Sequence, residues 1–231
     1  MKPMESPHPP LRTFGRIRSR VIKPRQAALM NSLLPGVAIP DGPFDPRTLA
    51  PKAAEIWLEI GFGGGEHLAA QAARRPDILS LGAEPFLNGV ASVLRHIEDG
   101  GLTNVRLHAG DARDLMANLP DACLDRLFVL FPDPWPKARH NKRRLIQPDF
   151  IETAARLMKL GAMLRFATDW ADYADHALAM LRKSPCFVWV AERADDWRLP
   201  PTDHVATRYE EKRLGDCDPI WLEFRRVDHV E

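Results

Sequence analysis

Two short stretches of the 231-residue sequence carry residues that could do chemistry. Residues 55–65 read EIWLEIGFGGG, in which four glycines follow an apolar stretch. Residues 131–144 read FPDPWPKARHNKRR, in which Asp133 stands between two prolines and a dense cationic run follows. Glycines permit sharp turns and close approach of a ligand, and prolines fix the backbone on both sides of the acid. The first stretch is therefore typical of a ligand-binding turn and the second of a stiff acidic corner.

These residues are spaced among alternating strand and helix patterns. Strands are predicted over 55–61, 78–84, 105–111, 125–131, 162–169, 187–192 and 220–227. Helices are predicted over 66–75, 86–99, 112–119, 148–160 and 170–183, with Gly161 ending the fourth of them. Strands that alternate with helices of this length indicate βαβ units. The expected fold is a mostly parallel sheet with helices on both faces.

The glycine turn predicts a cofactor site at Gly61, Gly63 and Gly65, where a helix begins after the first strand. A dinucleotide-binding pattern would have a further glycine where this chain has Glu66, whose carboxylate would repel a pyrophosphate. Glu59, just before the glycines, would do the same. S-adenosyl-L-methionine has an ammonium and a sulfonium and no phosphate, so the two acids favour it over NAD. An NAD enzyme and a mere tight turn are the alternatives.

Acids also end the next strands. Glu84 follows the glycines by about 20 residues, where an acid can accept both ribose hydroxyls. Asp111 ends the third predicted strand and can accept an adenine amino group, although a helix cap explains it better when it is taken alone. Because parallel strands end at one edge of a sheet, we expect Glu59, Glu84 and Asp111 to share a ligand, with Asp133 beside it.

The acidic corner indicates a substrate. Trp135 offers a flat face for stacking, and Asp133 can accept ring N–H groups of a planar heterocycle. Enzymes that methylate amino groups share such a proline–aromatic step, and a structural proline turn followed by a solvated basic loop is the plainer explanation. However, the cationic run borders the expected pocket, and residues 2–25 add seven Lys/Arg with one acid. Two basic segments beside one cleft favour a polyanionic substrate that presents one of its bases to the expected pocket.

Composition limits the class of protein. Lys+Arg number 32 and Asp+Glu 31, so binding to nucleic acid must come from local clusters. The three cysteines are far apart without zinc-site spacing, and no apolar run reaches the length of a membrane span, which predicts a cytoplasmic protein without bound metal. Residues 1–54 are predicted to be a basic, partly disordered extension, with a connecting loop over 35–51, and residues 55–231 the catalytic domain.

Taken together, EIGFGGG, GAEPF, FPDPWPKARHNKRR, ATDW and TRYE resemble the tRNA (guanine-N7)-methyltransferase family. The resemblance extends from about Arg12 to Arg225. It implies a Rossmann-like class I methyltransferase with a seven-stranded sheet, acting as a monomer or homodimer. The implied reaction transfers a methyl group from S-adenosyl-L-methionine to guanine-46 in the variable loop of tRNA. Methylation of an exocyclic amine, or RNA binding without catalysis, are the competing functions.

The resemblance also implies roles for individual residues. Cofactor contacts would come from Glu59, Glu84, Asp111 and Asp133, and Asp133 would also be the active-site acid. Substrate contacts would come from Lys137, Asp169, Thr207, Arg208, Tyr209 and Glu210. The RNA backbone would lie against Arg139, His140, Asn141, Lys142, Arg143 and Arg144. Without the resemblance, a cap on the next helix explains Asp169 better than a substrate contact does.

Overall fold

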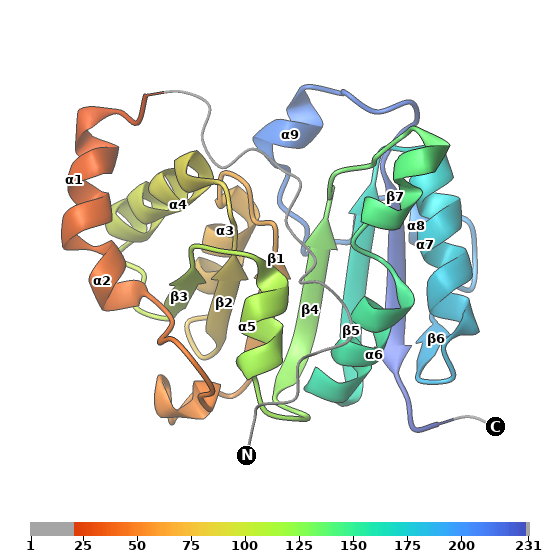
Figure 1. Cartoon of the computed structure of the whole chain (residues 1–231), viewed down its shortest axis with the longest axis horizontal. Helices are drawn as coiled ribbons and strands as arrows, with labels where there is room; N and C mark the ends of the chain where they lie inside the picture. The colour runs from red at the N-terminus through yellow and green to blue at the C-terminus, as the bar shows by residue number, and fades with distance from the viewer. Residues whose placement is uncertain (1–20, 230–231) are drawn as a thin grey trace, which may run out of the picture.

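The computed structural model describes residues 21–229. Within them, a seven-stranded sheet has the order β3-β2-β1-β4-β5-β7-β6 (Figure 1). Neighbouring strands are parallel from β3 to β5, and β7 is antiparallel to both β5 and β6. The strands are β1 Ile56–Ile60, β2 Leu79–Ala83, β3 Val105–His108, β4 Leu124–Leu130, β5 Met158–Thr168, β6 Phe187–Trp189 and β7 Ile220–Arg226. The predicted Rossmann-like, mostly parallel sheet is confirmed.

Helices cover both faces of the sheet, so the central strands are buried on both sides. On one face, α5 (Ala112–Asn118), α6 (Pro148–Leu157) and α7 (Ala171–Lys183) pack in one core cluster with strand residues such as Leu58 and Phe166. On the other face, α3 (Glu66–Arg74) and α4 (Leu87–Gly100) bury Leu68 and Leu94 against Leu107 of β3. This layered packing holds the strand ends, and the residues that follow them, in fixed positions.

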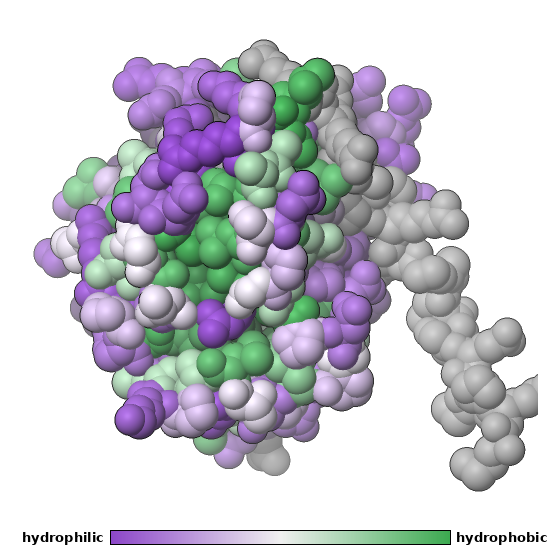
Figure 2. Space-filling view, turned by 90° about the vertical axis from the view of Figure 1, so that its left-hand side faces the viewer, coloured by the Kyte–Doolittle hydropathy of each residue, from purple (hydrophilic) through white to green (hydrophobic). Residues whose placement is uncertain are grey.

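The segment predicted as an extension contains helices that pack on the domain. These are α1 (Pro24–Ser32), α2 (Leu34–Val37) and the 3-10 helix η1 (Pro46–Thr48). Leu29 of α1 is buried in the cluster of α4, and Arg25 forms ion pairs with Glu98 and Asp99 at the end of α4. Figure 2 views this side and shows apolar surface in its middle, bordered by hydrophilic side chains. Lys23, the N-cap residue of α1, is also described and is exposed. The other five basic residues of the arm, Lys2, Arg12, Arg16, Arg18 and Arg20, and the expected disorder of residues 1–10, lie outside the described residues.

Several predicted boundaries are wrong. Helix α6 ends at Leu157, not at residue 160, and β5 begins at once with Met158. The cause is strand pairing, because Met158 pairs with Leu124 across β4, and a register shift follows before Arg126. Gly161, with φ of 85°, lies inside this irregular start of β5 and does not end the helix. Strand β6 is also shorter than predicted, ending at Trp189.

Short helices occur in the connections expected to be loops. The cationic run forms a 3-10 helix, η2 (Ala138–Arg143). The long connection between β6 and β7 contains α8 (Asp195–Arg198) and α9 (Arg208–Glu211). In Figure 1, α9 lies above the upper ends of the central strands. Among residues 21–229, no helix combines the length and apolarity needed to cross a bilayer.

Candidate functional site

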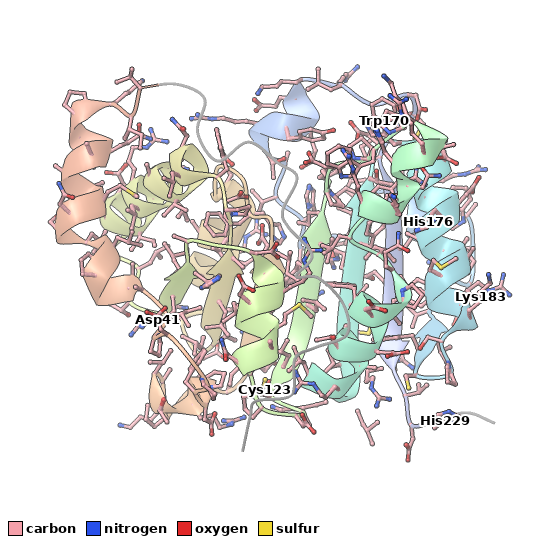
Figure 3. The ribbon with its side chains drawn as sticks, in the orientation of Figure 1. Asp41, Cys123, Trp170, His176, Lys183 and His229 are labelled. Carbon is pink, nitrogen blue, oxygen red and sulfur yellow. The ribbon has the colours of Figure 1, made fainter. Side chains whose placement is uncertain are left out.

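The predicted acids lie at one edge of the sheet. Those that follow β2, β3, β4 and β5 are Glu84, Asp111, Asp133 and Asp169. In Figure 3, Trp170, just beyond β5, lies at the upper edge of the molecule, whereas Cys123, just before β4, lies at the opposite edge. Because these four strands are parallel, all of the acids lie at the upper edge.

The glycine turn after β1 is held by the acid after β2. The Glu84 carboxylate accepts the backbone N–H of Gly63 at 2.8 Å through one oxygen and that of Phe86 at 2.8 Å through the other. Gly61, Gly63 and Gly65 all have positive φ, and Gly65 also lies against Val93 of α4, where a side chain would clash. The turn is therefore fixed in shape, and it leaves the start of α3 without a side-chain cap.

Three carboxylates crowd the part of this edge near β1. Glu59 is buried in β1, with its Oε2 atom 2.7 Å from Nδ1 of His67. Burial raises the pKa of Glu84 against the effect of its two backbone N–H partners, and the charges of Asp133 and Glu59 raise it further. Mutual repulsion of this kind is relieved by a cation. The donor set therefore fits a ligand that carries positive charge and not one that carries phosphates.

Asp111 caps a helix, as its sequence position alone suggested. Its side chain accepts the backbone N–H of Arg113 at 3.0 Å and also binds the Arg113 guanidinium with both oxygens. The capping geometry makes it the N-cap of α5. One edge of the predicted ligand site is thereby made rigid, and a role for Asp111 in cofactor binding stays a prediction.

The acidic corner is strained. Phe131 and Trp135, on either side of the Pro132–Pro134 step, have φ of 52° and 46°, in the left-handed region that non-glycine residues rarely adopt. The backbone of Phe131 is held in this conformation by its N–H, which donates to the carbonyl of Ala167 at 2.8 Å. Such strain persists only where surrounding structure imposes it, and it concentrates at functional sites.

Asp133 is exposed at this corner but closely surrounded by protein. Desolvation raises its pKa above the ordinary value of an aspartate. The charge of Asp133 also affects Tyr209. The pKa of Tyr209 rises to about 12 through desolvation, through the charge of Asp169 and, more weakly, through that of Asp133. Since the charge of Asp133 also raises the pKa of Glu84, Asp133 lies on the same rim of the sheet as the acid that follows β2.

Arg144 corrects a prediction, because its side chain is not available to RNA. The residue is 3% exposed. Its Nε donates to the carbonyl of Pro134 at 2.9 Å, its Nη2 pairs with Asp172, and its guanidinium lies 4.9 Å from the ring centre of Tyr173. A buried arginine that is fully engaged in this way supports the acidic corner from below and cannot bind a phosphate.

The rest of the cationic run lies on the surface. Lys137, Arg139 and Lys142 are exposed. Arg143 lies over Trp135 at 4.9 Å, and His140 packs edge-on against the same ring. Desolvation and the neighbouring cations, Arg143 first among them, lower the pKa of His140, so its ring stays neutral at pH 7. The backbone carbonyl of Asn141 accepts from the side chain of Gln147 and the N–H of Arg144.

The structure joins the predicted substrate residues of β5 and α9. The hydroxyl of Tyr209 donates to Oδ1 of Asp169 at 3.2 Å, and the same ring packs on Phe131 of the acidic corner. Asp169 is not a helix cap, because α7 has Trp170 at that position and no side-chain capping bond. The strand-end acid therefore positions α9 over the edge that carries Asp133.

The ends of this segment are also fixed. Thr207 and Glu210 form a capping box, in which each side chain accepts the backbone N–H of the other residue. Arg208, on the exposed side of α9, reaches Glu66 at the start of α3 with N···O of 3.3 Å. Thr207 and Glu210 thus have structural partners, and contacts of either with a substrate stay predictions.

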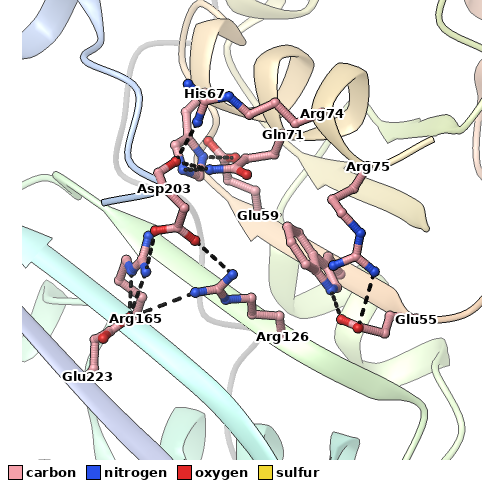
Figure 4. A network of polar contacts seen from close by, with 11 residues as sticks. Glu55, Glu59, His67, Gln71, Arg74, Arg75, Arg126, Arg165, Asp203 and Glu223 are labelled. Atoms are coloured by element: carbon pink, nitrogen blue, oxygen red, sulfur yellow. Dashed lines mark hydrogen bonds and ion pairs between the residues drawn. The ribbon is translucent and has the colours of Figure 1, made fainter. Parts of the chain in front are cut away.

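A buried polar network beside α3 was missed by the sequence analysis (Figure 4). It joins His67 and Gln71 of α3 to Asp203, which precedes α9. Asp203 in turn pairs with Arg126 of β4 and Arg165 of β5. The only sequence signal was the spacing of His67 and Gln71, which places both on one face of a helix.

Comparison with known proteins supports one family. The model of a family described as "Putative methyltransferase" matches residues 53–221. The chain is 61% identical to the tRNA (guanine-N(7)-)-methyltransferase of Caulobacter vibrioides (strain NA1000 / CB15N) over 222 residues, which cover 96% of this chain and 98% of that protein. It is 54% identical to the protein of the same name from Hyphomonas neptunium, with 93% and 99% covered.

The chain belongs to the tRNA (guanine-N7)-methyltransferase family. The resemblance inferred from the sequence is therefore confirmed, and so is S-adenosyl-L-methionine as the cofactor of a methyltransferase of this family. The 16S rRNA (adenine(1408)-N(1))-methyltransferase from Catenulisporales acidiphilia shares the fold, with a TM-score of 0.56, 18% identity, and 84% of this chain and 99% of that one covered. KamB, a 16S rRNA methyltransferase, is similar at a TM-score of 0.53 and 16% identity, with 78% and 92% covered.

Proposed function

We propose that this chain transfers the methyl group of S-adenosyl-L-methionine to N7 of a guanine in tRNA, and that the guanine is position 46 of the variable loop. The family's named activity supports the first part. The structural observation that carries it is the crowding of Glu59, Glu84 and Asp133 at one edge, beside a strained corner and a cationic surface. S-adenosyl-L-methionine has the ammonium and sulfonium that such a site favours. Glu59, Glu84 and Asp111 would hold it.

The chemistry requires alignment more than proton transfer. The cofactor supplies an electrophilic methyl group on a sulfonium. Guanine N7 attacks with an in-plane lone pair and has no proton to lose, so no general base is needed, and His140 needs no proton-transfer role. Asp133 would accept ring N–H groups and orient the base. Its negative charge would also stabilise the positive charge that develops on the ring.

The test is incubation of the protein with labelled S-adenosyl-L-methionine and, separately, unmodified tRNA, DNA or protein, followed by nucleoside or amino-acid analysis. We expect 7-methylguanosine in the tRNA alone, and mapping to position 46. Label on an exocyclic amine, or on DNA or protein, would favour the rival methyltransferases. Binding of tRNA with no methyl transfer would favour an RNA-binding protein that has kept the fold.

The exposed cations of the run should contribute to tRNA affinity through phosphate contacts. We expect Arg139→Gln and Lys142→Gln each to lower the slope of log Kd against log salt concentration by about 0.9, without changing turnover at saturating tRNA. Lys183→Gln is the matched control, because this lysine lies at the far end of α7 from the site (Figure 3). An unaltered slope in both variants would mean that the cationic run is a solvated surface helix that makes no phosphate contacts.

A further inference from the structure

A chain of hydrogen bonds runs from β1 to the segment before α9 (Figure 4). With the Glu59 carboxylate as its partner at 2.7 Å, His67 donates from Nδ1, so its Nε2 accepts from the Gln71 amide at 3.1 Å. The same amide donates its second proton to the backbone carbonyl of Asp203 at 2.7 Å. The Gln71 amide therefore connects an acid expected to face the cofactor with a residue 132 positions away.

The far end of this chain is anchored to the sheet. Oδ2 of Asp203 pairs with Arg126 at 2.9 Å, and its Oδ1 pairs with Arg165 at 2.8 Å. The Arg165 side chain is 2% exposed and also binds Glu223 of β7. Arg165 is buried, whereas the side chain of Asp203 is 35% exposed, so these charged hydrogen bonds are only partly shielded from water. The position of Asp203 is thus set by the sheet on one side and by Gln71 on the other.

The next residue carries this position into α9. His204 stacks on His67 with ring centres 5.6 Å apart and an interplanar angle of 27°, and its side chain is 5% exposed. Its Nε2 donates to the carboxylate of Glu210 at 2.9 Å. Glu210 in turn closes the capping box with Thr207, so His204 fixes the first turn of the segment expected to contact the substrate.

We propose that His67, Gln71 and His204 are positioning residues that couple the cofactor side of the site to α9. In this arrangement, cofactor bound against Glu59 fixes the position of His67. His67 in turn holds Asp203 through the Gln71 amide, and it holds His204 through ring stacking. Cofactor binding therefore stabilises the 203–213 segment before tRNA arrives. The inference rests on the proposed function, since it takes Glu59 as a cofactor contact and α9 as a substrate contact.

Limited trypsin digestion tests the coupling without tRNA. Arg208, Lys212 and Arg213 are exposed cleavage sites in and after α9. For the wild type, we expect saturating S-adenosyl-L-methionine to slow cleavage at these sites by about fivefold or more, the scale of ordinary coupling between sites. In Gln71→Met, which keeps the shape of the side chain and removes both donors, the cofactor should no longer change the cleavage rate.

Arg74→Met is the matched control. Arg74 donates to the same Asp203 carbonyl at 2.8 Å from the exposed side and has no hydrogen bond to His67. This variant should keep the protection seen in the wild type. Equal protection in wild type and Gln71→Met, or no protection in wild type, overturns the proposal.

Binding and turnover separate positioning from packing. Gln71→Met should bind S-adenosyl-L-methionine within about twofold of wild type in calorimetry, whereas its turnover on tRNA should fall about tenfold through misalignment. A loss of cofactor affinity as large as the loss of turnover indicates mere packing and overturns the proposal. If the wild type forms no 7-methylguanosine, the proposed function fails, yet the digestion experiment still decides whether cofactor and α9 are coupled.

Discussion

Replacing Asp133 with asparagine should lower turnover by about 100- to 1,000-fold, the usual loss when one preorganised electrostatic group is removed. The asparagine keeps the shape of the side chain and one acceptor oxygen but loses the negative charge that opposes the charge growing on the guanine ring. Affinity for S-adenosyl-L-methionine, measured by calorimetry, should change far less, because Glu59 and Glu84 remain. Unchanged turnover would remove Asp133 from catalysis.

The pH dependence of the same reaction provides a second check. Because desolvation raises the pKa of Asp133 above 3.8, the acid gains its proton at a less acidic pH than an ordinary aspartate. In the role proposed for Asp133 the ionised form is the active one, so kcat/KM for tRNA should fall as the pH is lowered through this raised pKa. The acid limb should disappear in Asp133→Asn. Asp149→Asn, which removes an exposed acid near the other end of the cationic run, should retain the limb and stay within about twofold of wild-type turnover.

The edge of the sheet could be predicted because period and order in the chain determine it. Apolar strands that alternate with helices required a parallel sheet, and a parallel sheet brings Glu84 and Asp133 to one side although 49 positions separate them. The glycine turn could be predicted from local sequence, because Gly63 and Gly65 have backbone angles that other residues rarely adopt.

What the sequence could not provide is the partner of each polar group. Asp169 meets Tyr209 across 40 positions, and the contact depends on how a long connection folds back over β5. His67 and His204 stack although nothing in the local pattern of either residue marks it as buried. The division of the chain at residue 54 shows the same limit, because the packing of Leu29 on α4 follows from no periodicity within the proline-rich segment.

The cationic run shows why residue type alone was insufficient. Arg139 and Arg144 look alike in the sequence, yet the first is exposed and the second is 3% exposed beneath the acidic corner. A guanidinium is planar and forks, so one buried arginine can hold Pro134, Asp172 and the face of Tyr173 together. The strain at Trp135 is then sustained by a residue nine positions further along the chain.

Arg144→Met should therefore damage the fold and the reaction together. The lost charged hydrogen bonds should lower the free energy of unfolding by about 2 kcal/mol, a decrease in Tm of about 4–8 °C for a domain of this size. With its support gone, the strained corner should relax and move Asp133, and a displacement near 1 Å lowers turnover by about 100-fold. Thermal unfolding and turnover at saturating tRNA measure both effects.

The comparison with Arg139→Gln separates support from RNA binding. Arg139→Gln should flatten the salt dependence of tRNA affinity while leaving Tm and saturated turnover unchanged. Arg144→Met should instead lower Tm and saturated turnover while leaving the salt dependence unchanged. Arg144→Lys should not restore turnover, because an ammonium keeps the charge but cannot reach Pro134 and Asp172 as a planar fork does. A flatter salt dependence in Arg144→Met with an unchanged Tm would instead mean that this guanidinium leaves its buried site and binds a phosphate.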